Sequence, residues 1–101
     1  MDETKRNNET MSVEDLKNKG NECVKNGNFI EAVIHYTQAI KMEPNNYVLY
    51  SNRSFAFLKL DQHYLSLQDA NETVRLQPQW AKVSKIQFGF ALVSDSLLVY
   101  A

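Results

Sequence analysis

The sequence predicts an all-α protein, a right-handed superhelix of helical hairpins with two full repeats and an atypical third half-repeat. Residues 40–44 (Ile-Lys-Met-Glu-Pro) align with residues 74–78 (Val-Arg-Leu-Gln-Pro) at an offset of 34 positions, the difference between Pro78 and Pro44. Each unit of that length carries two apolar runs at helical spacing, separated by turn-forming residues. A fixed period of this length is typical of solenoids built from pairs of helices.

Further pairs at the same offset match small residues with small ones and bulky apolar residues with bulky ones. Small residues at fixed places let neighbouring helices approach closely, as stacked hairpins require. One such match could arise by chance, but five together with the proline-bounded ends indicate an internal repeat. The pairs are Leu16 with Tyr50, Gly20 with Ser54, Cys23 with Phe57, Ala32 with Ser66 and Ala39 with Thr73.

The first repeat, residues 12–45, opens with the residues of a helix start. Ser12 and Asp15 have the spacing of a capping box, in which side chains satisfy the first backbone N–H groups. The helix that follows carries an apolar stripe at helical spacing. The stripe consists of Leu16, Gly20, Cys23 and Val24.

A turn and a second helix complete this repeat. Gly27 can take the left-handed conformation that ends a helix, and Asn28 with Glu31 repeats the capping pattern. The second helix is expected to stop before Pro44, because the residue preceding a proline disfavours helix. Its apolar stripe consists of Phe29, Ala32, Val33, Tyr36, Ala39 and Ile40.

The second repeat, residues 46–79, follows the same order. Its helices are expected over 47–60 and from about residue 63 to residue 77, with a turn at 61–62. Propensity agrees with the apolar pattern in each segment, and such agreement is itself evidence for the fold.

Two segments flank the repeats. Residues 1–11 are predicted to be a disordered polar tail, and residues 80–101 a divergent third-repeat helix or a C-terminal tail. The repeat pattern fails here, because the small residue of the Gly20 position would fall at Phe88. Two interpretations stay open: an apolar helix that covers the second repeat, or a poorly ordered end produced by truncation or alternative splicing.

Composition narrows the range of partners and locations. The 101 residues suit one domain and carry a net charge of -1, and nucleic-acid binding would require a clear basic excess. The most apolar stretch, residues 88–100, is too short to span a membrane. Cys23 is the single cysteine, and the N-terminal residues are too polar for a signal peptide. We therefore expect a cytoplasmic protein with neither nucleic acid nor membrane as partner.

The sequence contains no recognisable catalytic or cofactor motif. Gly-rich phosphate loops, HExxH and CxxC patterns are absent from it. His35 and His63 fall on different predicted helices, and Cys23 occupies a predicted core position. The sequence thus predicts no enzyme activity, no catalytic residue, no cofactor and no metal site.

Four segments show a more specific resemblance. They are residues 16–22 (Leu-Lys-Asn-Lys-Gly-Asn-Glu), 32–40 (Ala-Val-Ile-His-Tyr-Thr-Gln-Ala-Ile), 48–54 (Val-Leu-Tyr-Ser-Asn-Arg-Ser) and 76–82 (Leu-Gln-Pro-Gln-Trp-Ala-Lys). Together they resemble the carboxylate-clamp tetratricopeptide-repeat (TPR) domains of Hsp70/Hsp90 co-chaperones. The likeness covers roughly residues 12–82. It implies a helical adaptor that binds the acidic C-terminal peptides of cytosolic heat-shock chaperones.

The resemblance also implies a set of peptide-binding residues. Lys17 and Asn21 match the Lys and Asn of the first helix of the clamp, Asn52 matches the Asn of its third helix, and Lys82 matches the Lys of its fifth. The Arg expected on that fifth helix falls at Ile86, so the implied clamp is incomplete.

Two further residues follow from Asn52. Phe55 and Lys59 lie three and seven positions after it on the same helix face, where they could contact peptide residues upstream of the terminus. Because the lost Arg removes a charged donor, we expect roughly ten- to hundredfold weaker binding than a full clamp gives.

Alternative functions remain open beside the adaptor. The chain could be a TPR scaffold for a different protein partner, with the clamp residues unused. It could also be a truncated form with weak binding that associates with itself through its apolar end. We expect a monomer. Weak self-association is expected only if the chain is the truncated form.

Overall fold

The computed structural model describes residues 11–78, which contain four α-helices and, within that range, no strand. The expectations for residues 1–10 and 79–101, including those for Lys82 and Ile86, lie outside the described residues. The helices are α2 (Val13–Lys25), α3 (Phe29–Met42), α4 (Tyr47–Lys59) and α5 (His63–Leu76).

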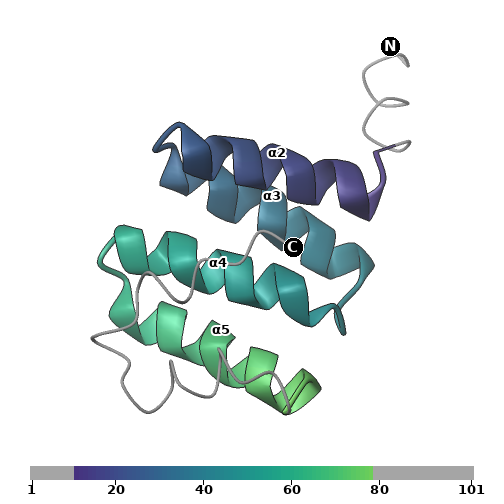
Figure 1. Ribbon diagram of the computed structural model, residues 1–101, viewed down its shortest axis with the longest axis vertical. Helices are drawn as coiled ribbons and strands as arrows, with labels where there is room; N and C mark the ends of the chain where they lie inside the picture. Colours follow the sequence, from purple (N-terminus) through teal and green to yellow (C-terminus); the bar gives the residue numbers. More distant parts are fainter. Residues whose placement is uncertain (1–10, 79–101) are drawn as a thin grey trace.

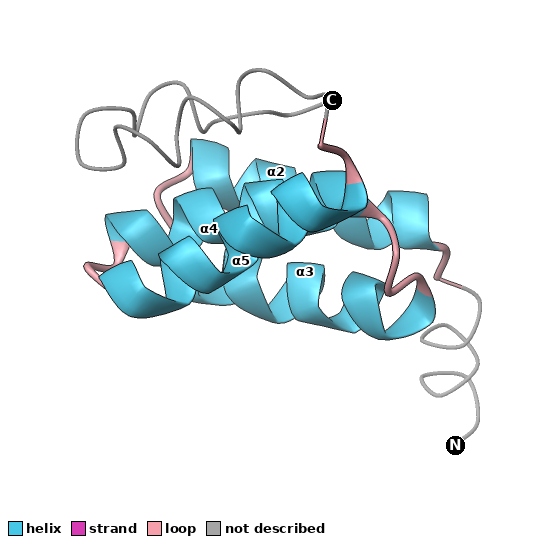
Figure 2. Cartoon of the chain, turned by 90° about the horizontal axis from the view of Figure 1, so that it is seen from below, coloured by secondary structure: helices cyan, strands magenta, loops and turns pink. Residues whose placement is uncertain are grey.

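The four helices form two stacked hairpins, as the repeat predicts. Helix α2 packs along α3, α3 along α4, and α4 along α5, in chain order (Figure 1). A smaller set of contacts joins α2 directly to α4. Seen from below, α2 and α4 lie towards one side and α3 towards the other (Figure 2). The first helix of each repeat therefore contributes to one shared face.

The sequence predicts side-chain caps at the starts of α2 and α3, and only the cap of α2 is present. The capping box at α2 is confirmed: Ser12 Oγ accepts from the Asp15 N–H at 3.0 Å, and Asp15 Oδ2 accepts from the Ser12 N–H at 3.2 Å. The capping prediction for Asn28 is wrong, because its side chain makes no cap hydrogen bond to α3. Asn28 has a ψ of 71° where Ser12 has the extended value of 167° that an N-cap needs.

The two hairpin turns use the same backbone conformation at equivalent positions. Gly27 has a φ of +78° and Asp61, which lies 34 positions later, a φ of +61°. A left-handed residue after a helix end is the usual way to reverse the chain, and glycine adopts it without strain. Aspartate is among the few other residues that tolerate it.

The small residues of the repeat allow close helix contacts, but each repeat achieves this differently. In the first, Gly20 lies against the Tyr36 ring, and a Cβ on Gly20 would come within 2.5 Å of the ring carbon Cε1. In the second, Ser54 Oγ donates to the Ser66 carbonyl at 2.6 Å, and Ser66 Oγ donates to the Ser54 carbonyl at 2.8 Å. Both serines are fully buried, so each hydroxyl satisfies a partner in place of water.

The buried residues form two clusters between the helices. The larger cluster joins all four helices, and the smaller joins α2, α3 and α4. Five of the residues in the predicted apolar stripes of the first hairpin belong to these clusters, and four more pack against them while partly buried, namely Cys23, Phe29, Val33 and Ile40. The larger contains Val24, Ala32, Tyr36, Phe55, Ala56 and Ala70, and the smaller contains Leu16, Ala39 and Leu49.

An ion pair joins the two helices of the second repeat, and its arginine also bonds to the first repeat. Arg53 on α4 donates to both carboxylate oxygens of Asp69 on α5, at 2.7 and 2.9 Å, and to Thr37 Oγ1 on α3 at 3.0 Å. The Asp69 side chain is 7% exposed and that of Arg53 19%. A guanidinium shared between two neighbouring helices fixes their relative position, since its planar fork tolerates little displacement.

Candidate functional site

Asn21 and Asn52, predicted as binding residues from separate repeats, are in direct contact. Asn52 on α4 donates from Nδ2 to Asn21 Oδ1 on α2 at 3.3 Å. The same oxygen accepts from the Tyr36 hydroxyl of α3 at 2.5 Å. Three helices thus meet at one amide group. Asparagine is a poor helix former, and this contact supplies the reason for its presence inside α4.

Asn52 is buried as well as paired. Its side chain is 2% exposed, and its Oδ1 has no hydrogen-bond donor among the described residues. Leaving a buried acceptor unsatisfied costs about 1–3 kcal/mol. The hydrogen bond to Asn21 fixes the other end of this amide at the contact between α2 and α4.

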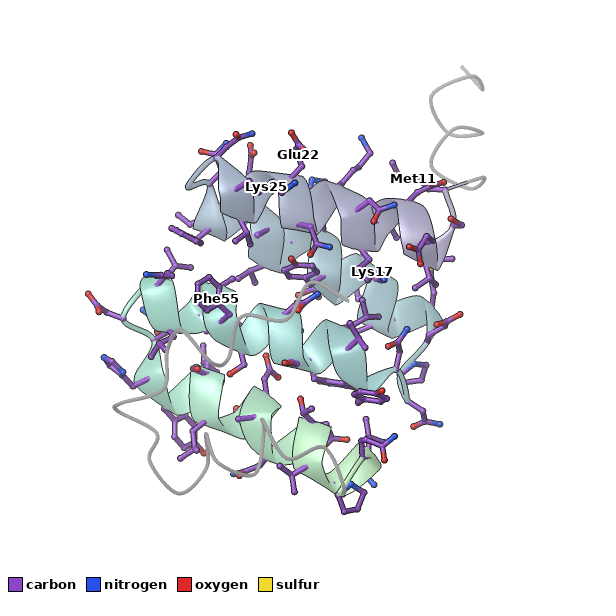
Figure 3. The ribbon with its side chains drawn as sticks, viewed as in Figure 1. Met11, Lys17, Glu22, Lys25 and Phe55 are labelled. Carbon is purple, nitrogen blue, oxygen red and sulfur yellow. The ribbon has the colours of Figure 1, made fainter. Side chains whose placement is uncertain are left out.

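Lys17 lies one helical turn before Asn21 on α2. Figure 3 shows its side chain extending from α2 towards α4, on the side where the two helices approach each other. The side chain is 14% exposed, and its Nζ lies 3.5 Å from Glu14 Oε2. Residues four apart share a helix face, which gives Lys17 and Asn21 a common direction. Three predicted binding residues are therefore gathered on the face shared by α2 and α4, whereas Lys82 lies outside the described residues.

Phe55 and Lys59 lie further along α4. Phe55 is 5% exposed and packs edge to face against Phe29 of α3, with the ring centroids 6.4 Å apart. The Lys59 ammonium lies over the Phe55 ring, 5.4 Å from its centroid. Phe55 therefore belongs mainly to the core, and Lys59 is the member of this pair that is exposed to solvent.

A hollow in the surface lies beside Asn21. It has a volume of about 320 Å³ and is lined by Asn18, Asn21, Glu22 and Lys25, two of which Figure 3 labels on α2. From the sequence, Tyr36 was expected only to pack in the core. Its hydrogen bond to Asn21 and this hollow were not predicted. Neither could have been found from spacing, since both depend on which side chains of different helices meet.

Cys23 lies near this region but has the features of an inert thiol. It is half-buried, and burial raises the pKa of the Cys23 thiol, with a further contribution from the negative charge of Glu31. A raised pKa disfavours the thiolate, which is the reactive form.

Neither a metal centre nor a membrane span is found in residues 11–78. No group of three or more His, Cys, Asp or Glu side chains there is placed to hold a metal ion. No helix of that range has the length and apolar character that crossing a bilayer requires.

Comparison with known proteins agrees with the arrangement of the helices in hairpins. Residues 13–46 match the family model described as Tetratricopeptide repeat. The chain is 45% identical over 70 residues to "Hsp70-Hsp90 organizing protein 2" of Arabidopsis thaliana, an alignment that covers 69% of this chain and 12% of that protein. It is 40% identical over 68 residues to "Protein STIP1 homolog" of Dictyostelium discoideum, covering 67% of this chain and 12% of that protein.

A third relative extends the pattern. The chain is 39% identical over 70 residues to "Stress-induced-phosphoprotein 1" of Caenorhabditis elegans, covering 69% of this chain and 22% of that protein. The chain thus spans less than a quarter of the length of these relatives. Sequence match and helix arrangement lead to one conclusion: this is a tetratricopeptide-repeat chain, built from the helical hairpins of that family.

Proposed function

We propose that the chain is a protein–protein interaction adaptor of the co-chaperone type, which binds the acidic C-terminal peptide of a partner. Lys17, Asn21 and Asn52, together with Lys82, would hold the terminal carboxylates. The observation that carries the proposal is the Asn52–Asn21 hydrogen bond of 3.3 Å, which joins two binding candidates 31 positions apart in the sequence.

The chemistry of these groups suits a peptide terminus. A terminal aspartate presents two carboxylates that must lose water on binding. Ammonium and amide N–H donors replace that water with charge-assisted hydrogen bonds, each worth about 1.5–3 kcal/mol. The name of the Arabidopsis thaliana relative describes that protein as organizing Hsp70 and Hsp90. We extend this to the present chain as a proposal, along with a cytoplasmic location and the absence of catalysis.

The test is a titration with a fluorescent peptide ending in Glu-Glu-Val-Asp, as the free acid and as the C-terminal amide. The free acid is expected to bind at least tenfold more tightly, and binding should weaken as NaCl is raised. Asn52→Ala should reduce the affinity by about ten- to hundredfold, since it removes a buried donor. Asn71→Ala, at an exposed position of α5, is the matched control and should leave it unchanged.

Equal affinity for the acid and the amide would refute the proposal. An Ile86→Arg variant asks whether the departure from the clamp pattern matters, since restoring the donor should strengthen binding by about ten- to hundredfold. No gain from that variant would remove the missing Arg as the cause of weak binding.

The isoleucine at position 86 favours a second candidate, a TPR scaffold for a partner without an acidic terminus. Such a partner would be captured from cytosol equally well by Lys17→Ala, Asn52→Ala and the parent chain. Size-exclusion chromatography separates both candidates from a self-associating truncated form, which would elute as more than a monomer.

A further inference from the structure

The Tyr36 side chain crosses from α3 to α2 inside the first hairpin. It is 1% exposed, and its ring lies so close to the Gly20 backbone that a Cβ there would come within 2.5–2.8 Å of three ring carbons. Its hydroxyl reaches Asn21, the residue that follows Gly20. The absence of a side chain at Gly20 is therefore what lets the hydroxyl reach the amide.

The hydroxyl acts on one end of the Asn21 amide. Asn21 Oδ1 accepts from Tyr36 at 2.5 Å and from Asn52 at 3.3 Å, so both acceptor sites of that oxygen are directed into the protein. The Nδ2 group is attached to the same planar carbon and points to the opposite side. Fixing the oxygen thus fixes the direction in which the two N–H groups point.

The second repeat has no equivalent of this arrangement. The positions 34 residues after Gly20 and Tyr36 are Ser54 and Ala70, a larger residue on the first helix and a smaller one on the second. Ser54 bonds to Ser66 rather than to a residue of the shared face. A tyrosine was therefore not required to fill the space inside such a hairpin.

We propose that Tyr36 is a positioning residue for peptide recognition: its hydroxyl holds the Asn21 amide so that its N–H donors face the C-terminal carboxylate of the bound peptide. This inference rests on the proposed function. A residue that acts through another in this way sets the geometry of binding without contacting the ligand, and small losses of geometry weaken charge-assisted bonds.

The test compares Tyr36→Phe with Tyr50→Phe. Each change removes a single hydroxyl, and that of Tyr50 donates to the Pro44 carbonyl at 2.8 Å, away from the shared face. Tyr36→Phe is expected to lower the affinity for the free-acid peptide about three- to tenfold, with the weaker binding of the amide unchanged. Tyr50→Phe should leave both affinities unchanged.

A double-mutant cycle distinguishes positioning from general loosening of the fold. In an Asn21→Ala background, Tyr36→Phe should have no further effect on peptide affinity, because the amide that it positions is gone. An equal loss in both backgrounds would overturn the proposal, and so would equal effects of Tyr36→Phe and Tyr50→Phe.

A ligand-independent measurement keeps this inference separate from the proposed function. The side-chain amide of Asn21, followed by ¹⁵N relaxation in the peptide-free protein, should be rigid in the parent chain and mobile in Tyr36→Phe. The free-acid and C-terminal-amide peptides could bind equally while Tyr36→Phe still loosens the Asn21 side chain. In that case the proposed peptide function fails but the positioning role of Tyr36 stands. If the Asn21 side chain is equally rigid in the parent chain and in Tyr36→Phe, the positioning role fails.

Discussion

Replacing Gly20 by alanine sets two opposing effects against each other at one position. Alanine is favoured over glycine inside a helix by about 1 kcal/mol, because glycine loses more backbone freedom on folding. Against this, the new Cβ would lie 2.5, 2.8 and 2.8 Å from three carbons of the Tyr36 ring. Real carbon contacts are 3.5–4.0 Å, roughly, so the ring or α2 must move.

The ring has little room to move. Tyr36 is 1% exposed, lies within the larger core cluster and is tied to Asn21 through its hydroxyl. Overpacking a filled core costs about 1–3 kcal/mol, and three contacts this short place Gly20→Ala in the upper part of that range. After the helix gain is subtracted, we expect a net destabilisation of about 1–2 kcal/mol.

Urea unfolding followed by circular dichroism measures this difference, with a lower midpoint and an unchanged slope as the expected result. Asn18→Ala, on the exposed side of the same helix, is the control: it adds helix propensity without a clash and should not lower the midpoint. A Gly20→Ala protein as stable as the parent would show that the Tyr36 ring is not confined. Tyr36 would then be free to shift and would not hold the Asn21 amide in one direction.

Two further predictions concern the ion pair of Asp69 and the thiol of Cys23. Asp61→Asn, at a side chain that is 91% exposed, is the control for both and should change neither the melting temperature nor the alkylation rate. Asp69→Asn should destabilise the fold by about 2–3 kcal/mol, because Arg53 is left without its carboxylate; an unchanged melting temperature would refute the role of that ion pair. Glu31→Gln should speed alkylation of Cys23 by iodoacetamide at pH 7, since burial and then Glu31 raise the thiol pKa; an equal or slower rate would contradict this.

The regular features of the fold were predictable because they are local. Ser12 and Asp15 meet within a single helical turn, and their capping box formed as the spacing indicated. At Asn28 the same spacing formed no cap, because its backbone, directly after the left-handed Gly27, has a ψ of 71° and is not extended. A cap depends on dihedral angles that the sequence of four residues does not fix.

The candidate site was predictable only through the family resemblance and only in part. Lys17 and Asn21 share a face because they are four residues apart on one helix, which spacing alone establishes. That Asn52 touches Asn21 depends on the packing of α4 against α2 across a whole intervening helix. Phe55 illustrates the limit, since its expected place beside a peptide and its observed place in the core are equally compatible with the spacing.

The sequence by itself determined the period of 34, the four helices and the two turns, since each depends on residues close together in the chain. The tertiary structure alone decided which side chains meet: the Tyr36 hydroxyl with Asn21, and Arg53 with Asp69. The reason is physical. Hydrogen bonds between helices form or fail over a few tenths of an ångström, and that distance is set by how closely the helices pack.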